Sequence, residues 1–511
     1  MKIFEELRKK ETEQARKEQL IDKLIEMIMG NFVTFVRKHD TVRLIEAIVQ
    51  HANEKQRDQI FDELRDEIIE LSKLKYGKFF VLKMLKYGSA KQKQQIIGSF
   101  YGHVPNLLNH ACASNVLETI YNEYANLKQR NELIQEYFGS EFKFFKDQQT
   151  GSLREALDGL DKAKREQIMN HLKDQLNKLS NKVVTNFSMT HYLYREFFKN
   201  AAPNDRNELA QSLAEKAVEM LHTKDGSRVG LHILWNSAAK ERKIVIKSFK
   251  KFVAKTAMEE NGHYVLLGIF DCVDDTKLIE KHILDELFAK ENIVQVASNK
   301  YGCKVLEFLL SPRDTRFFHP DQIAILAEGD SNEHSKKSKD IRQKELKRVA
   351  SPLLLSLVAN HCSELIESGS TLLIYNILTN AEEGDRHAAL VKLVDCLADC
   401  GELKDDEHML IKKKDLYFLI KKLLQTDKIK LKENDDYEAF SSVLVDNLSE
   451  NVLKSYCSCN KGCFLLLALC ETGIERVVTK VKKLIGKGER KQLASISKQS
   501  KGAELLLAKL V

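Results

Sequence analysis

The segment GSRVGLHIL, residues 226–234, recurs in altered form along the chain, for example as GHYVLLGIF at residue 262 and GCKVLEFLL at residue 302. Each copy begins with glycine or another small residue, continues with two variable residues, and then places apolar residues at helical spacing. Eleven such segments align, and they begin at Thr41, Gly77, Ala113, Thr190, Gly226, Gly262, Gly302, Ser370, Leu416, Gly462 and Gly502. A single match would be an ordinary amphipathic helix, so the interpretation depends on the spacing of the matches.

The spacing indicates a repeat array. The steps between segments are 36, 36, 77, 36 and 36 residues, followed by 40, 68, 46, 46 and 40. A period of this size is typical of one supersecondary unit per period, with neighbouring units sharing a continuous core. We expect an all-α chain in which each unit holds a short helix and two longer ones. The 77-residue step has room for a degenerate unit near residues 150–185. The 68-residue step holds a polar stretch at 329–340, which predicts an exposed, mobile loop.

Composition supports a helical, globular chain. Of 511 residues, 43% are hydrophobic and 30% are charged, and only five are proline. No stretch of about 18 apolar residues occurs, so the sequence predicts no membrane contact. The charged start, MKIFEELRKKETEQ, lacks the apolar core of a secretory signal, which predicts an intracellular protein whose ten cysteines are mostly reduced and buried.

Positive charge is clustered. The net charge is only +7, but no Asp or Glu occurs between Glu70 and Glu118, a stretch that contains seven lysines. Because average composition would place five or six acidic residues there, roughly one in eight, the gap is more than a chance fluctuation. Such a block is either a solvated helix face or a surface for phosphate groups.

Several strings resemble the pumilio (PUF) family, and in particular its divergent Puf-A branch. They are HTKDGSRVGLHILW, FDCVDDTKLIEKHIL, NKYGCKVLEFLLSPRD and GDSNEHSKK. The resemblance implies a right-handed α-solenoid of about eleven pumilio-type three-helix repeats, L-shaped overall. Residues 1–140 would hold an N-terminal helix and the first three repeats, and residues 141–511 about eight more.

In PUF repeats, the first and fifth residues after the small residue contact a base edge, and the second residue stacks between bases. Five of the eleven fifth positions here are leucine, which offers no hydrogen-bonding group to a base, although these leucines could equally be core residues. The pairs Ser114/Glu118 and, more weakly, Cys303/Glu307 resemble readers, and His191 and His263 occupy first positions. No contiguous base code is present.

The stacking positions keep rings and cations, and lysines surround the second repeat. Aromatic and guanidinium planes stack on any base, and lysines bind phosphate without reading sequence. The candidate stacking residues are Arg43, Phe79, Tyr192, Arg228, Tyr264 and Lys304. The candidate phosphate contacts are Lys75, Lys78, Lys83 and Lys86, with Lys78 at a reader position. Phe418 and Phe464 also fall at stacking positions, but they lie in apolar strings and are expected in the core.

No sequence feature indicates catalysis, a cofactor or a metal. The common phosphate-loop, nucleophile-elbow and zinc-protease motifs do not occur. The cluster CSCNKGC contains Cys457, Cys459 and Cys463, but it lacks the CxxC spacing and the fourth ligand of a structural zinc site.

Three functions are compatible with these observations. The first is an RNA- or DNA-binding solenoid with little sequence preference. The resemblance places such a protein in the nucleus and nucleolus, where pre-rRNA, pre-ribosomal particles and double-stranded DNA would be its partners. The second is a sequence-specific mRNA-binding regulator of translation, and the third is a protein-binding scaffold. We expect a monomer.

Overall fold

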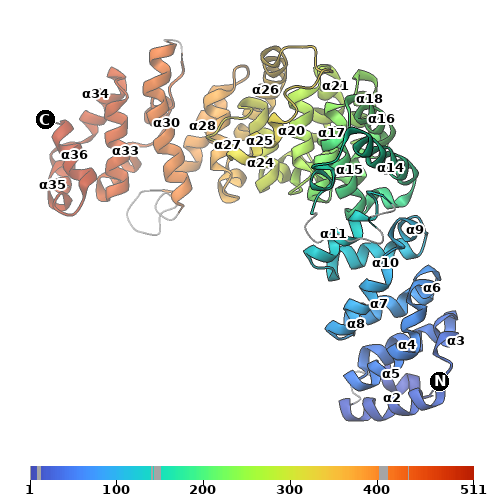
Figure 1. The fold of residues 1–511 in the computed structure, drawn as a ribbon. Helices are drawn as coiled ribbons and strands as arrows, with labels where there is room; N and C mark the ends of the chain where they lie inside the picture. Colours follow the sequence, from blue (N-terminus) through green and yellow to red (C-terminus); the bar gives the residue numbers. More distant parts are fainter. Residues whose placement is uncertain are drawn as a thin grey trace. The chain divides into compact units, whose positions relative to one another are not determined.

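The computed structural model describes residues 2–8, 13–139, 142, 151–401, 413–434 and 437–510, and within them it contains helices and no strand. By internal contacts the chain forms two compact units, Met1–Asn236 and Ser237–Val511. Most of the chain is built from a short helix, an inner helix that carries the recurring segment, and an outer helix (Figure 1). The predicted all-α repeat array is confirmed. The boundary predicted at residues 140/141 lies outside the described residues.

The first unit begins with two helices and contains five of the recurring segments. Its helices are α1 (Lys2–Arg8), α2 (Gln14–Ile28), α3 (Phe32–Val36), α4 (His39–His51), α5 (Glu54–Leu64), η1 (Arg65–Glu67), α6 (Ile68–Lys73), α7 (Gly77–Tyr87), α8 (Ala90–Phe100), α9 (Val104–Leu108), α10 (Ala113–Thr119), η2 (Ile120–Tyr124), α11 (Leu127–Gln135), α13 (Leu153–Leu157), α14 (Lys162–Ser180), η3 (Val183–Asn186), α15 (Ser188–Asn200), α16 (Pro203–Leu213), η4 (Ala214–Met220) and α17 (Lys224–Trp235). Inner helices α4, α7 and α10 pack in succession, and α15 packs on α17.

The second unit contains the other six segments. Its helices are α18 (Ala239–Ser248), α19 (Val253–Met258), α20 (His263–Cys272), α21 (Thr276–Ile279), η5 (Glu280–Leu284), α22 (Asp285–Leu287), α23 (Ile293–Ala297), α24 (Lys300–Leu310), α25 (Pro320–Ala327), α26 (Lys339–Glu367), α27 (Thr371–Asn380), α28 (Arg386–Ala398), α30 (Lys414–Glu433), α31 (Phe440–Asn447), α32 (Glu450–Ser455), η6 (Tyr456–Ser458), α33 (Asn460–Glu471), α34 (Glu475–Leu484), α35 (Lys487–Ile496) and α36 (Lys501–Leu510). The inner helices α20, α24, α27, α30, α33 and α36 each pack on the next.

The glycine that opens many of the segments is a close-packing residue. A Cβ at Gly77, Gly226, Gly302 or Gly462 would lie within 3.0 Å of the carbonyl oxygen of the residue six positions earlier, at the end of the short helix. At Thr41 the side-chain hydroxyl instead donates a hydrogen bond to the equivalent carbonyl, that of Phe35. A carbonyl near the end of the short helix therefore rests on the start of the inner helix, and the small residue permits that approach.

A glutamate on the outer helix closes the start of the short helix in three repeats. Glu63 accepts hydrogen bonds from the backbone amides of Gly30 and Phe32, each at 2.9 Å. Glu136 and Glu286 make the same pair of contacts in their own repeats. The first amides of a helix have no partner within the helix, so a carboxylate there supplies an acceptor and a favourable charge.

Outer helices α5, α8 and α11 all begin with a capping box. Asn53, Ser89 and Asn126 each cap the helix, and a glutamine three residues later bonds back to the cap residue. Two of these glutamines are buried and also bond the preceding helix layer: Gln56 reaches Asp22 at 2.6 Å, and Gln92 reaches Asp58 at 2.8 Å. Each of these two glutamines thus completes the cap of its own helix and also fixes the position of that helix against the preceding repeat.

The degenerate segment near 150–185 lacks the pair of an inner and an outer helix that most repeats have. It contains the one-and-a-half-turn helix α13 and the long helix α14, which packs on α15 and α16. The buried face of α14 is apolar and is formed by Ile168, Leu172, Leu176 and Leu179. The segment therefore fills the long step in the repeat pattern with a single outer-type helix.

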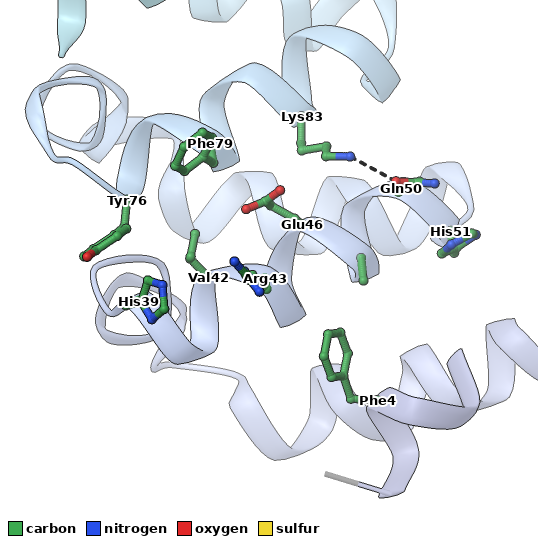
Figure 2. A pocket seen from close by; sticks show the side chains of 11 residues that line it. Phe4, His39, Val42, Arg43, Glu46, Gln50, His51, Tyr76, Phe79 and Lys83 are labelled. Atoms are coloured by element: carbon green, nitrogen blue, oxygen red, sulfur yellow. Dashed lines mark hydrogen bonds between the residues drawn. The ribbon is translucent and has the colours of Figure 1, made fainter. Parts of the chain in front are cut away.

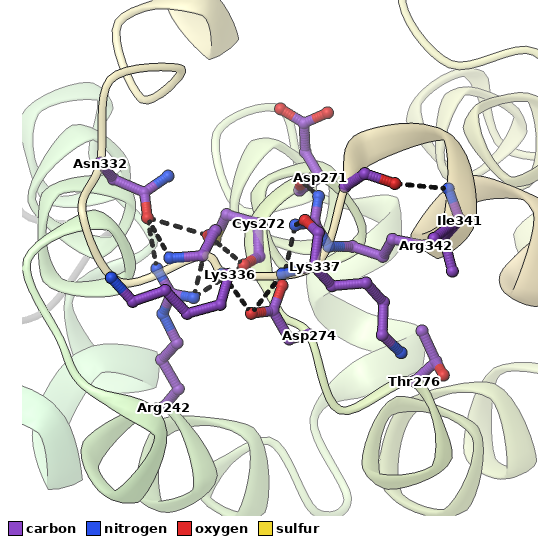
Figure 3. Close-up of polar contacts among 12 residues, drawn as sticks. Arg242, Asp271, Cys272, Asp274, Thr276, Asn332, Lys336, Lys337, Ile341 and Arg342 are labelled. Atoms are coloured by element: carbon purple, nitrogen blue, oxygen red, sulfur yellow. Dashed lines mark hydrogen bonds and ion pairs between the residues drawn. The ribbon is translucent and has the colours of Figure 1, made fainter.

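The polar stretch at 329–340 forms a loop in which half of the residues are exposed, as predicted, and several of the others join a polar network (Figure 3). Arg242 donates to the Asn332 side chain at 2.9 Å and to the Cys272 carbonyl at 2.7 Å. Asp274 accepts from the backbone amides of Lys336 and Lys337 at 2.6 and 3.1 Å. Because these partners come from distant parts of the sequence, the composition of the loop gave no sign of them.

Among the described helices, α26 is long and apolar enough to meet the length and composition of a membrane span. The sequence search for apolar runs did not single it out, because charged residues precede its apolar part. In the fold its buried leucines, among them Leu354 and Leu365, belong to the core that it shares with α24, α27 and α28. Its backbone leaves helical geometry at His361 (φ −133°, ψ 26°), which divides the helix in two.

Candidate nucleic-acid interface

A groove of about 630 Å³ lies along inner helices α4 and α7 of the first unit. Figure 2 shows Arg43, Glu46 and Lys83 around the groove, with the rings of Tyr76 and Phe79 along it and Phe4 of α1 opposite. The groove brings together three residues that the sequence indicated, Arg43, Phe79 and Lys83, from consecutive repeats. It also contains residues that the sequence analysis did not select, namely His39, Gln50, His51 and Tyr76.

The lysines of the acid-free stretch carry uncompensated charge. Lys73 pairs with Glu70 at 2.7 Å, at the edge of the stretch. The other six, Lys75, Lys78, Lys83, Lys86, Lys91 and Lys93, form no ion pair with an acidic side chain in the part of the chain that the structure describes. Within the groove the Lys83 ammonium donates to the Gln50 amide oxygen at 2.9 Å, which is a neutral partner. The surface of α7 is therefore positive and available to anions.

One carboxylate lies in this basic groove. Burial raises the pKa of Glu46, and the positive charges of Lys83 and Arg43 oppose that shift. Neither cation forms an ion pair with Glu46 in the structure. Glu46 therefore moderates the positive potential of the groove without removing it.

Aromatic rings accompany the lysines on α7. Phe79 is 39% exposed, which is unusual for phenylalanine, and the Lys78 ammonium lies 5.5 Å from its ring centroid. Tyr76 meets His39 edge-on at 5.1 Å, and Lys75 lies 5.5 Å from the Tyr76 centroid. Phe79 follows the small residue of its repeat by two positions, as Arg43 does in the preceding repeat. Lysines beside accessible rings are the combination that binds phosphate and stacks bases on a single strand.

The predicted base readers are not available at the surface. Ser114, His191 and His263 are 2% exposed or less. Glu118 is used within the fold: its carboxylate accepts the Ser188 backbone amide at 2.6 Å, at the start of α15. The sequence suggested that the pair Ser114/Glu118 reads a base edge, but in the structure both residues take part in the fold.

Three other fifth positions, Leu231, Leu267 and Glu307, are also buried. Leu231 and Leu267 are fully buried, as expected if these leucines are core residues. Glu307 is 1% exposed, and Lys304 donates to it at 2.9 Å and also to the Phe317 carbonyl. Burial raises the pKa of Glu307, and the Lys304 charge opposes this. Lys304, predicted as a stacking residue, is thus engaged inside its repeat.

The remaining predicted stacking residues are half-buried and are not among the residues that line the α4–α7 groove. The Tyr192 hydroxyl donates to the Gly151 carbonyl at 3.2 Å, and burial raises the pKa of Tyr192 to about 12. Arg195 covers its ring at 4.9 Å. Arg228 and Tyr264 are partly exposed, and the Tyr264 ring packs on His263 at 4.3 Å.

A second groove, of about 380 Å³, lies between inner helices α27 and α30 of the second unit. Phe418 lines it and is 51% exposed, which corrects the prediction that it is a core residue. Lys422 lies 5.5 Å from the Tyr375 ring, and Lys421 lies 5.4 Å from the ring of Phe464 on the next inner helix, α33. Phe418 and Phe464 share the repeat position of Phe79, and the apolar strings around them outweighed that signal in the sequence.

No metal-binding cluster of three or more His, Cys, Asp or Glu side chains occurs among the described residues. In the CSCNKGC segment, Cys457 and Cys463 are buried. The Cys459 sulfur accepts the Gly462 amide at 3.4 Å and so caps α33. The three cysteines therefore take part in packing and in helix capping.

Fold and grooves together define a helical-repeat protein with a basic, ring-bearing inner face. The model of the Pumilio-family RNA binding repeat matches residues 43–65 and 68–98, which include most of the α4–α7 groove, and that of the CPL (NUC119) domain matches residues 298–436. The chain is 36% identical to human Pumilio homolog 3, over 99% of this chain and 78% of that protein. It is 34% identical to Pumilio domain-containing protein 12 of Caenorhabditis elegans, over 99% of this chain and 66% of that protein.

Solved structures agree. The crystal structure of human Puf-A superimposes with a TM-score of 0.90 at 36% identity, covering 99% of this chain and 98% of that one. The crystal structure of human Puf-A in complex with DNA gives the same values. The chain belongs to the Puf-A-like branch of the pumilio family.

Proposed function

We propose that this protein binds RNA and DNA strands through phosphate and base-stacking contacts, with little sequence preference. The observation that carries the proposal is the α4–α7 groove, where lysines without acidic partners adjoin the rings of Tyr76 and Phe79 on repeats whose reader positions offer no base code. Phosphate contacts supply affinity for any sequence, and rings stack on any base. The α27–α30 groove, with Tyr375, Phe418 and Lys422, offers a second surface of the same chemistry.

The family relationship supports this proposal. The RNA-binding-repeat match overlaps the groove, and human Puf-A has been crystallised with DNA. We further propose that the protein acts in the nucleolus on pre-rRNA within pre-ribosomal particles, during large-subunit assembly; this role rests on the resemblance. A sequence-specific mRNA regulator would need exposed edge readers, and Ser114, His191 and His263 are buried.

Replacing Lys78 and Lys83 together with alanine should weaken binding to RNA and DNA of every sequence alike. It should also flatten the plot of log affinity against log salt by about 1 to 2 units. The reason is that each phosphate contact releases about 0.7 to 0.9 counterions on binding, and the variant makes fewer such contacts. Fluorescence anisotropy across a salt series measures both effects. The matched control is Lys162→Ala/Lys164→Ala on α14, which removes equal charge from exposed positions elsewhere and should leave the slope almost unchanged. Equal loss in both double variants would show a net-charge effect, and no loss in the first would favour the scaffold function.

Randomised single strands of equal length should bind with affinities within about tenfold of one another, or roughly 1.4 kcal/mol. The reason is that the inner face presents lysines and rings where a reading repeat presents paired polar groups. Selection from a random pool followed by sequencing measures this. Enrichment of a motif of several bases, in which each mismatch costs about 1–3 kcal/mol, would contradict the proposal.

A further inference from the structure

A ring from the first helix of the chain faces the α4–α7 groove. Phe4 of α1 lines the same cavity as Arg43 and Phe79. In Figure 2 the Arg43 side chain lies between the Phe79 ring and the Phe4 ring. The Phe4 side chain is half-buried, and the space in front of it is open cavity rather than packed side chains. The exposed Arg43 side chain therefore has a ring on either side of it within one groove.

Other residues hold α1 in place, so the fold does not need Phe4 as an anchor. Leu7, one turn further along α1, is fully buried, and α1 packs on both α2 and α4. The Glu6 carboxylate forms an ion pair with Arg16 of α2 at 2.9 Å. Residues three apart on a helix are neighbours on its surface, so the buried Leu7 fixes the side of α1 on which Phe4 lies. The Phe4 ring is thus directed to the groove by a helix that is attached elsewhere.

Phe4 continues a series of planar groups that the repeats begin. Phe79 and Arg43 occupy the same repeat position on α7 and α4, which pack on each other, and α4 in turn packs on α1. α1 lies before the first recurring segment, yet it contributes a ring to the same cavity. Planar side chains that follow one another along a groove hold successive bases by stacking, whatever the sequence of the strand.

We propose that Phe4 is a stacking platform for nucleic acid, so that α1 extends the binding site by one nucleotide beyond the first repeat. This inference rests on the proposed function, because it requires a strand in the α4–α7 groove. One base stacks between Phe79 and Arg43, and the next stacks between Arg43 and Phe4, since a guanidinium plane accepts a ring on either face. The ligand at this end of the groove is an unpaired nucleotide, because a base inside a duplex is already stacked on its neighbours.

The test measures binding of a fluorescein-labelled strand of deoxyadenosines to the full-length protein by anisotropy across a salt series. Phe4→Leu keeps a side chain of similar bulk but removes the ring. We expect it to weaken binding about fivefold or more, which is the loss that removal of one stacking contact produces. The slope against log salt should stay as in the parent, because no charge is removed.

Two further variants separate stacking from packing. Phe4→Tyr keeps a ring and should bind as the parent does. Met27→Ala, at a 72% exposed position of α2 that does not line the groove, is the matched control and should also bind as the parent does. Circular dichroism checks that each variant is folded.

A second measurement follows the ring itself. Phe4→Trp places an indole in the groove, and its fluorescence should be quenched when the unlabelled strand binds. In the parent the signal comes from Trp235 alone, which is 6% exposed and does not line the groove, so it should not change. Quenching in the variant but not in the parent would support a base stacked at this position.

The outcomes distinguish this proposal from the proposed function. If Lys78→Ala/Lys83→Ala weakens binding while Phe4→Leu binds like the parent and Phe4→Trp shows no quenching, only the role of Phe4 is overturned. Tighter binding by Phe4→Leu would also overturn that role, because it would show that α1 obstructs the groove. If neither the lysine variant nor Phe4→Leu loses affinity, the groove is not the binding site and both proposals fail.

Discussion

Gly226→Ala is expected to destabilise the first unit by about 3 kcal/mol or more, because overpacking in a tight interior costs this much when backbone atoms must move. A methyl group at Gly226 would lie within 3.0 Å of the Met220 carbonyl group and 2.9 Å from His191 Nδ1. The carbonyl belongs to the backbone at the end of η4 and cannot turn aside as a flexible side chain would. The helix-propensity gain of alanine over glycine, about 1 kcal/mol, offsets only part of this cost.

The measurement is urea unfolding followed by the fluorescence of Trp235, the single tryptophan of the chain, which lies on α17 and is 6% exposed. Gly98→Ala is the matched control: this glycine lies within α8, where an added Cβ meets no atom within 4 Å. It should stabilise its helix by up to about 1 kcal/mol. Similar unfolding midpoints for Gly226→Ala and the parent would show that the short helix can move away from the glycine.

Acid should also destabilise the first unit strongly, by about 3 to 4 kcal/mol between pH 7 and pH 5. Burial lowers the pKa of His191 to about 3, with a smaller contribution from His222, and burial likewise lowers the pKa of His232 to about 3. An unfolded histidine titrates near pH 6.5, so below that pH the unfolded chain binds more protons than the folded one. The part of the folding stability that depends on neutral histidines is fully present above about pH 6.5 and is lost as the pH falls toward 3. At pH 5 each histidine has lowered the free energy of unfolding by about 2 kcal/mol, and His232 by somewhat less because it is partly exposed.

The Trp235 unfolding curve at a series of pH values tests this expectation. His232→Phe should remove close to half of the pH dependence, because the new ring can keep the stacking on Phe198, at 5.3 Å between centroids, without a titrating group. His103→Gln, at an exposed position of the same unit, should leave the pH dependence as in the parent. A stability that is flat between pH 7 and pH 5 would mean that both histidines accept a proton without unfolding.

The repeat array could be predicted from the sequence because its signal is local. The glycine at 226 and its equivalents fall at the start of inner helices, since the close approach of the short helix requires a small residue six positions later. The leucines at 231 and 267 are core residues for a related reason: the apolar period of one helix identifies its buried face.

The interface was predictable only in part. The acid-free lysine stretch marked α7, because charge composition requires no knowledge of tertiary contacts. Glu118 was misleading, since its partner, the Ser188 amide, is 70 residues away. Phe418 lies in an apolar string, and hydrophobicity alone does not distinguish the side of a helix that meets the core from the side that is exposed on the inner face. Asn332 and Arg242, 90 residues apart, show the same limit for the loop at 329–340.

The contact between each short helix and its glycine also determines where such a chain can grow during evolution. The six-residue interval from Leu71 to Gly77 recurs between Val296 and Gly302, and one inserted residue there would rotate the inner helix away from the carbonyl that rests on it. The turn from inner to outer helix carries no such constraint. The extra length of the 68-residue step lies there, between the end of α24 at Leu310 and the start of α26 at Lys339. New sequence, and with it new surface, can therefore be added after an inner helix while the spacing of the stacked core is preserved.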